Sequence, residues 1–143
     1  MKTPALPFDE EKRLASLRES GLLDSGTNER FDRLTRLAKR LFNVPIALVT
    51  LVGEKTLHFK TSDGRVHESL PRHLSFCGHT ILSTTPLIVN DAGSDERFCD
   101  NPLVTGESHL RFYAGYPLRL PDGALVGSFC LLDRSPRAFS SAE

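Results

Sequence analysis

The fold of this chain is decided by the stretch RFYAGYPLRLPDGALVGSFCLLD, residues 111–133. Residues 111–120 and 124–133 each predict a β-strand, and Pro121-Asp122-Gly123 between them is a strong hairpin turn. Strands joined by so short a turn pair in the antiparallel direction. We therefore expect two neighbouring antiparallel strands near the end of the chain.

Further strands are predicted upstream of this hairpin. Residues 46–52, IALVTLV, form an apolar, β-rich run that is typical of a central strand. Residues 57–60 alternate apolar and polar, as a more exposed hairpin partner does, and residues 86–90 predict another strand. Because hairpins rather than crossovers join the strand pairs, the sequence predicts an α+β domain built on an antiparallel sheet.

The first predicted helix has a thin apolar face. Asp9 can cap it, it runs to about Ser20, and Gly21 ends it. Its apolar side consists of little more than Leu14 and Leu17. We therefore expect this helix to be fixed only weakly against its own core.

The second predicted helix, which Thr27 can cap, has a clear apolar stripe and a basic face. We expect the stripe to face the core, and it consists of Phe31, Leu34, Leu37, Ala38 and Leu41. The basic face consists of Arg30, Arg33, Arg36, Lys39 and Arg40. A solvated face is the commoner reason for such charges, and no aromatic residues interleave with them to stack bases, so we expect no nucleic-acid partner.

A short helix at residues 75–82 and a long loop at residues 91–109 complete the predicted elements. The loop holds three Asp, two Gly and two Glu without a sustained period. Long loops inside compact domains often serve as lids or binding loops. This segment is therefore a candidate cover for a binding site.

Length and composition bound the possibilities. The 143 residues are 39% hydrophobic and 25% charged, which suits one soluble domain spanning residues 1–143. Eighteen basic and eighteen acidic residues cancel, which argues against binding to nucleic-acid phosphates or an anionic membrane. No apolar run approaches the ~20 residues of a membrane span. Three sparse cysteines and no leader sequence favour the reducing cytoplasm.

Eight stretches, in order along nearly the whole chain, together resemble the GAF domain family, as found ahead of bacterial histidine kinases, diguanylate cyclases and phosphodiesterases. They are GLLD (21–24), FDRLT (31–35), VPIALV (44–49), SFCGH (75–79), DERF (95–98), NPLV (101–104), RFYAG (111–115) and GSFC (127–130), with Asp133. The resemblance implies a central antiparallel sheet of five to six strands, N-terminal helices on one face and a loop-covered pocket on the other. It implies no particular ligand or cofactor, and the signature of the family's cyclic-nucleotide branch is absent.

We expect the pocket between the sheet face and the loops 62–79 and 91–109. The candidate ligand-binding residues are Phe76, Cys77, His79, Asp91, Arg97, Phe98, Asn101, Phe112, Tyr113 and Tyr116. Because side chains alternate along a strand, Phe112 and Tyr116 face one way and Tyr113 the other, so only one set can line the pocket. Structural roles are the alternative: Asp91 can cap a turn, Arg97 can pair with a loop carboxylate, and Cys77 can be a packed thiol.

We expect no catalytic residues and no metal site, because no familiar catalytic motif or metal-ligand spacing is present. The predicted function is therefore a sensory or regulatory domain that binds a small molecule or relays a signal. Two alternatives stay open. One, also a resemblance, is a GAF-fold free methionine-R-sulfoxide reductase using Cys77 and Cys99; the other is a purely structural dimerisation module.

The two ends of the chain indicate which partners to expect. Residues 140–143 resemble a helix start that has been cut short, and the first helix has little apolar face of its own. We therefore expect a homodimer formed through the terminal helices, and a downstream effector domain if the chain is a fragment.

Overall fold

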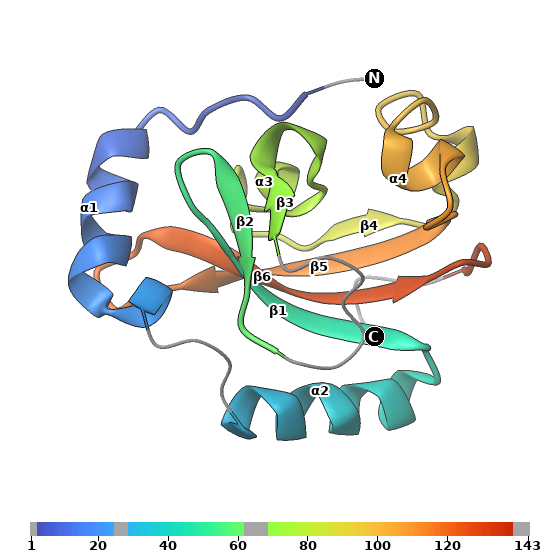
Figure 1. Cartoon of the computed structure of the whole chain (residues 1–143), viewed down its shortest axis with the longest axis horizontal. Coiled ribbons are helices and arrows are strands. Elements are labelled where there is room, and N and C mark those ends of the chain that lie inside the picture. The colour runs from blue at the N-terminus through green and yellow to red at the C-terminus, as the bar shows by residue number, and fades with distance from the viewer. Residues whose placement is uncertain (1–2, 25–28, 62–68, 139–143) are drawn as a thin grey trace.

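The computed structural model describes residues 3–24, 29–61 and 69–138 (Figure 1). The helices are α1 (Glu10–Ser20), α2 (Glu29–Phe42), α3 (Cys77–Thr80) and α4 (Pro102–Thr105). The strands are β1 (Ile46–Val52), β2 (Thr56–Phe59), β3 (Ser69–Pro71), β4 (Leu87–Val89), β5 (Phe112–Arg119) and β6 (Leu125–Asp133). Short 3-10 turns cover Leu22–Asp24, Arg72–Leu74 and Ala92–Ser94. Among these residues, no helix is both long enough and apolar enough to cross a bilayer.

The six strands form one sheet in the order β3-β2-β1-β6-β5-β4, and all neighbouring pairs are antiparallel. The prediction that β1, β6 and β5 lie side by side is confirmed, as is the hairpin at Pro121-Asp122-Gly123, where Gly123 has a φ of 93°. The α+β class with an antiparallel sheet is confirmed as well. Strand β3 was not predicted, because it lies in a mostly polar stretch of sequence without the apolar run or alternation that indicates a strand.

β1 and β6 are buried on both faces, which explains why their sequences are apolar almost without interruption. Their register pairs Leu48 with Cys130 and Ile46 with Leu132. Gly127 allows the two strands to approach, since a Cβ at this position would collide with the backbone oxygen of Thr50. The central pair thus has a single register that decides which side chains share a face.

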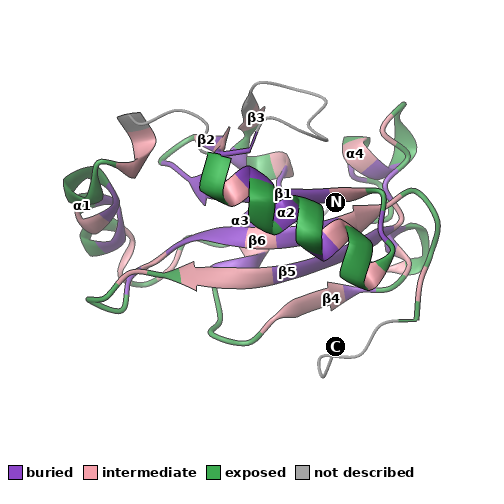
Figure 2. Cartoon of the chain, turned by 90° about the horizontal axis from the view of Figure 1, so that it is seen from below, coloured by how far each residue is buried: buried purple, intermediate pink, exposed green. Residues whose placement is uncertain are grey.

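The helices lie against the sheet in three places (Figures 1 and 2). α2 crosses one face, where Phe112, Ala114 and Leu131 form an apolar cluster with Ala38. α3 and α4 cover the other face. α1 lies at one end of the sheet, where Leu17 packs with residues of β1 and β6. The two N-terminal helices therefore do not share one face, because α1 packs on the end of the sheet.

The prediction that an apolar stripe of α2 faces the core is confirmed at Ala38 but is wrong for the three leucines. Leu34, Leu37 and Leu41 are 51%, 53% and 70% exposed, whereas the buried residues of α2 are Asp32, Thr35 and Ala38. At about 100° per residue, the centre of the leucine stripe lies roughly a third of a turn away from the centre of the buried face. The smaller residues face the sheet and allow α2 to lie close to β1.

The expectation of a weakly fixed first helix is also wrong. Leu14 and Leu17 are buried, and Arg13 beside them is only 1% exposed. The Arg13 guanidinium donates to the backbone oxygen of Val52 (2.8 Å) and to the Glu10 carboxylate (2.9 Å). Polar contacts therefore supply the attachment that the thin apolar face did not predict. The proposed cap Thr27, loop residues 62–68 and the expected helix start at 140–143 lie outside the described residues.

Candidate functional site

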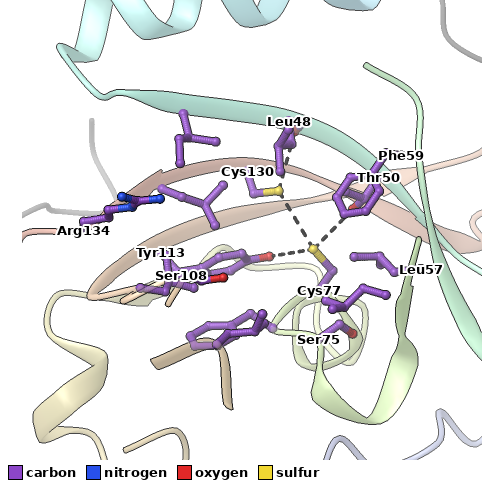
Figure 3. A pocket seen from close by; sticks show the side chains of 16 residues that line it. Leu48, Thr50, Leu57, Phe59, Ser75, Cys77, Ser108, Tyr113, Cys130 and Arg134 are labelled. Atoms are coloured by element: carbon purple, nitrogen blue, oxygen red, sulfur yellow. Dashed lines mark hydrogen bonds between the residues drawn. The ribbon is translucent and has the colours of Figure 1, made fainter. Parts of the chain in front are cut away.

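A cavity of about 100 Å³ lies on the face of the sheet opposite α2, between the strands and the α3 and α4 segments (Figure 3). Its walls are almost entirely apolar. The residues that line it are Ile46, Leu48, Thr50, Leu57, Phe59, Leu70, Ser75, Phe76, Cys77, Leu103, Ser108, Leu110, Tyr113, Cys130, Leu132 and Arg134.

Strand alternation and register place the sheet side of the cavity. Ile46, Leu48 and Thr50 are two residues apart along β1, so their side chains point to the same face. Directly opposite partners in an antiparallel pair also share a face. Cys130 and Leu132 of β6 therefore join Leu48 and Ile46 in the cavity wall.

Two loop segments form the other wall, and Asn101 ties them together. Its side-chain oxygen accepts from the backbone N–H of Leu103 (2.9 Å) and caps α4. Its side-chain nitrogen donates to the backbone oxygen of Leu74 (3.0 Å). Asn101 is 2% exposed, so this link is protected from water. It holds the α4 segment beside the start of α3.

One end of the cavity opens to the surface. Arg134 lines the cavity and is exposed, and Ser108, which also lines it, is half-buried. Within the described ranges, Arg134 has no hydrogen-bond or ion-pair partner. The mouth therefore offers a positive charge next to an apolar interior.

The closed end of the cavity holds two thiols and several hydroxyl groups. The Sγ atoms of Cys77 and Cys130 are 3.9 Å apart. The hydroxyls of Thr50 (3.2 Å) and Tyr113 (3.3 Å) both lie within donating distance of the Cys77 sulfur. Figure 3 shows these side chains converging from three strands and α3. This group is called the thiol cluster below: Thr50, Cys77, Tyr113 and Cys130.

The Tyr113 hydroxyl contacts neighbouring hydroxyls, and a glycine leaves the space that it occupies. This hydroxyl lies 2.8 Å from that of Thr80 and 3.1 Å from that of Ser128. A Cβ at Gly115 would collide with the Tyr113 hydroxyl and with Thr80. Gly115 thus leaves the room that the buried network needs. The hydroxyls of the cavity floor bond to one another and to sulfur, so their hydrogen-bonding capacity is used within the domain.

The thiol cluster separates the acidities of its members. The hydrogen bond from Cys130, together with those from Thr50 and Tyr113, lowers the pKa of Cys77 from 9.0 to about 7 against the opposing effect of burial. The pKa of Cys130 is raised well above its ordinary value by its hydrogen bond to Cys77 and by burial. Burial and the nearby Cys77 raise the pKa of Tyr113. Cys77 is therefore the group that carries negative charge first.

The structure brings three of the ten predicted ligand-binding residues to the cavity: Phe76, Cys77 and Tyr113. Phe112 and Tyr116 belong to the apolar cluster under α2, on the opposite face of the sheet. The alternation argument was right that the two sets are separated.

The other five predicted residues have structural contacts. Phe98 is fully buried and stacks on Phe76 with ring centroids 4.1 Å apart, and His79 packs edge-on against Phe98. The Asp91 carboxylate accepts from the backbone N–H of Gly93, and Asn101 caps α4 as described above. Arg97 forms a two-point ion pair with the carboxylate of Asp95 (3.0 and 2.8 Å). These residues shape the loops around the cavity.

Sequence reasoning missed most of the cavity wall, including Leu48, Thr50, Cys130 and Leu132. The signal that could have found them is the alternation of β1 combined with the register between β1 and β6. Alternation alone gives two sets of side chains without saying which faces the loops.

Cys99 lies apart from the thiol cluster, because it is exposed whereas Cys77 and Cys130 are buried. All three cysteines are free thiols. Among residues 3–24, 29–61 and 69–138, no group of three or more His, Cys, Asp or Glu side chains could hold a metal ion.

A six-stranded antiparallel sheet with a long helix on one face and a loop-covered cavity on the other defines a class of small α+β domains. The sequence model of the GAF domain matches residues 27–143 of this chain. The chain therefore belongs to the GAF domain family.

A curated relative is a cyclic di-GMP phosphodiesterase from Pseudomonas aeruginosa, 42% identical over 137 residues. The match covers 96% of this chain and 23% of that protein, so the chain spans less than a quarter of the relative's length. Relatedness at this level connects the chain to one region of a larger signalling protein.

Two solved structures illustrate the shared fold. A type II free methionine-R-sulfoxide reductase from Thermoplasma acidophilum aligns with a TM-score of 0.63 at 13% identity, covering 80% of this chain and 79% of that one. The GAF domain of an Acinetobacter phosphoenolpyruvate-protein phosphotransferase aligns with a TM-score of 0.57 at 18% identity, covering 92% and 82%. At these identities the likeness concerns the fold alone.

Proposed function

We propose that this GAF domain is a non-catalytic sensory module of a signalling protein and that it receives a small ligand in the cavity. The observation that carries the proposal is the cavity itself, which is apolar inside and opens at Arg134. Concave, mostly apolar sites with a few polar groups are typical of small-molecule binding. The relation to a cyclic di-GMP phosphodiesterase supports a signalling context.

The walls point to a compact ligand with an apolar body and an anionic end. The cavity, at about 100 Å³, is smaller than the apolar cavity of about 150 Å³ that takes up benzene, so a single small ring or a short chain has to extend partly into the open mouth. The floor hydroxyls already bond within the domain, so they do not call for a polar ligand head. The exposed Arg134 can pair with a carboxylate at the mouth.

Two measurements test ligand reception. Native mass spectrometry of protein freshly purified from its host reveals a retained metabolite. Titration with benzoate, followed by amide NMR, is expected to shift signals of the cavity residues. Benzyl alcohol is the neutral comparison, and Arg134→Gln is expected to weaken benzoate binding about threefold while leaving benzyl alcohol unchanged, since exposed ion pairs contribute less than about 1 kcal/mol.

A cavity-filling variant provides the matched control. Leu132→Phe adds volume inside the cavity, whereas Leu118→Phe makes the same change at a half-buried position of β5 that alternation places on the other face. Benzoate binding is expected to fall at least tenfold only in Leu132→Phe. Equal binding by both variants, or signal shifts confined to residues far from the cavity, would overturn the proposal.

The absence of catalysis is part of the proposal and has its own test. A reductase using Cys77 and Cys99 needs the two sulfurs to meet, whereas Cys77 is buried and Cys99 is exposed. We expect no turnover of free methionine-R-sulfoxide with a thiol reductant. Turnover that is lost in both Cys77→Ser and Cys99→Ser would establish the enzyme instead.

We propose that the domain self-associates through α2 and not through the terminal helices. Leu34, Leu37 and Leu41 form an exposed apolar stripe, which a second copy of this chain would bury. Light scattering over a concentration series is expected to show a dimer that Leu37→Glu abolishes, with Leu82→Glu, at another exposed leucine, as the control. A wild type that stays monomeric at every concentration would exclude the dimer.

A further inference from the structure

The thiol cluster contains a pair of cysteines that the sensory proposal does not use. Cys77 comes from α3 and Cys130 from β6, 53 positions apart in sequence, yet their sulfurs are 3.9 Å apart. A disulfide requires about 2.05 Å between sulfurs. The two sulfur atoms therefore need to approach by only about 1.9 Å for the bond to form.

Cys77 has the surroundings of a nucleophile. The hydroxyls of Thr50 and Tyr113 both lie within donating distance of its sulfur, at 3.2 and 3.3 Å. Hydrogen bonds to a sulfur favour its charged form, and the thiolate is the reactive form of cysteine. The sulfur of Cys130 also lies 3.6 Å from the backbone oxygen of Leu48. Its pKa is raised well above its ordinary value by its hydrogen bond to Cys77 and by burial, so Cys130 keeps its proton when Cys77 ionises. Cys77 is thus suited to react first as a thiolate, while Cys130 remains a thiol.

The cavity gives small molecules a route to both sulfurs. Cys77 and Cys130 line it, and so does Arg134, which is exposed at its mouth (Figure 3). A cavity needs only about 10–15 Å³ to hold one water molecule. A volume of about 100 Å³ therefore admits hydrogen peroxide, a neutral molecule with two heavy atoms.

We propose that Cys77 is an oxidation site for small peroxides and that Cys130 resolves it to a Cys77–Cys130 disulfide at the cavity floor. The inference needs the open cavity but no bound ligand, so it goes beyond the sensory proposal. It names the chemical class of signal that this part of the cavity can receive. Cys99, exposed and outside the cluster, takes no part.

The reaction balances in two steps. The Cys77 thiolate attacks one peroxide oxygen, the O–O bond breaks, and hydroxide leaves and takes a proton to become water. The sulfur of Cys130 then attacks the sulfenic sulfur of Cys77 and gives up its proton. The S–S bond forms, the S–O bond breaks, and the departing hydroxide combines with that proton as a second water. The two cysteines lose two electrons in all, and one peroxide is reduced to two waters.

The chain is well suited to a direct test, because trypsin places its three cysteines in separate peptides. Cys77 lies in residues 73–97, Cys99 in residues 98–111 and Cys130 in residues 120–134. The folded protein is treated with stoichiometric hydrogen peroxide, its remaining thiols are blocked, and the digest is read by mass spectrometry. We expect a cross-linked peptide of residues 73–97 and 120–134, with a mass loss of about 2 Da.

Variants separate the two roles. Cys99→Ser is expected to form the cross-link at the wild-type rate. Cys130→Ser is expected to stop at a sulfenic acid on Cys77, a gain of about 16 Da that dimedone traps. Cys77→Ser is expected to leave Cys130 reduced, and circular dichroism confirms that each variant is folded. Leu132→Phe, which fills the cavity, is expected to slow the reaction at least tenfold.

The pH dependence gives a further readout. The titratable groups that face Cys77 are Cys130 from β6 and Tyr113 from β5, and both have a raised pKa. The pKa of Cys77 is lowered to about 7, chiefly by its hydrogen bond with Cys130, so its oxidation rate is expected to rise with pH through a midpoint near 7.

Two results would overturn the proposal. The first is Cys77 and Cys130 remaining reduced while Cys99 is oxidised in the same sample. The second is a cross-link between Cys99 and either of the others in place of the Cys77–Cys130 pair. Benzoate titration reads ligand reception independently, so failure of one proposal is distinguishable from failure of the other.

Discussion

α1 and α2 are held against the rest of the domain in different ways. α1 has two leucines and buries both, with Arg13 beside them. α2 has three leucines and exposes all of them, while Asp32, Thr35 and Ala38 are buried. The comparison teaches that the number of apolar residues on a helix does not decide how firmly it is attached.

The attachment of α1 depends on a buried ion-pair network. Glu10 contacts both Arg13 and Arg72, and Arg72 in turn donates to the backbone oxygen of Gly53 (3.0 Å). Both guanidinium groups are nearly inaccessible to water. The network therefore joins α1 to the β1–β2 turn and to the segment after β3. α2, by contrast, meets the sheet through short side chains.

The largest expected effect contrasts one leucine from each helix. Leu17→Ala removes a side chain that is 0% exposed and is expected to destabilise the domain by about 3 kcal/mol. Leu37→Ala, at a side chain 53% exposed, is expected to change stability by less than about 0.5 kcal/mol. Urea denaturation measures both. Similar losses in the two variants would mean that α2 packs through its leucines after all.

The second prediction concerns the charge on Glu10. Burial raises the pKa of this carboxyl, but the hydrogen bonds from Arg72 and Arg13 outweigh it and hold the pKa below 4.5. Glu10→Gln is expected to cost about 2 kcal/mol at pH 7, because it leaves two buried guanidinium groups without their carboxylate.

The pH dependence of this cost has a definite sign. A folded-state pKa below the unfolded value means that the stabilisation is complete above about pH 4.5 and is lost as the pH falls through the folded-state pKa. The difference in unfolding free energy between wild type and Glu10→Gln is thus expected to shrink in acid. Glu11→Gln, at the exposed neighbouring position, is the control. A difference that persists unchanged in acid would rule out a role for the charge.

The third prediction tests whether α2 needs small residues where it meets the sheet. Thr35 is 1% exposed, so Thr35→Leu is expected to overpack the interface and destabilise the domain by about 1 to 2 kcal/mol. The reciprocal change Leu37→Thr is expected to have little effect. Thermal unfolding compares the two. A stabilised Thr35→Leu would mean that the interface has unfilled space.

The smallest expected effect is on the outer face of α2. Glu29 pairs with Arg36 at 2.8 Å and with Arg33 at 3.8 Å, and all three side chains are largely exposed. Glu29→Gln is expected to cost less than about 0.5 kcal/mol and to matter less as salt increases. A larger loss in urea denaturation would show that surface charge also attaches α2.

Local sequence signals were sufficient for most elements of the fold, although they did not predict β3. The bounds of α1 and β1 agree with the sequence prediction, and Gly21 ends α1 with a φ of 74°. Turn chemistry and short-range periodicity act over a few residues, so they can be read from the chain alone. The overall architecture was predicted from the eight stretches that resemble the GAF family.

The face of α2 could not be predicted in the same way. Periodicity identifies an apolar stripe, but it does not say whether the stripe meets the sheet or solvent. The structure places Ala38 against Ala47, Phe112 and Leu131, which lie on three different strands. Only the geometry of that contact selects the smaller residues for the interface.

The sequence by itself determined the family, the antiparallel hairpin of β5 and β6, and the separation of Tyr113 from Phe112 and Tyr116. Only the tertiary structure decided where the cavity lies and that Cys77 meets Cys130. The physical reason is that these two thiols come from α3 and β6, and strand register and loop packing bring them together. No local pattern of residues encodes a contact that forms only when distant segments share one face of a sheet.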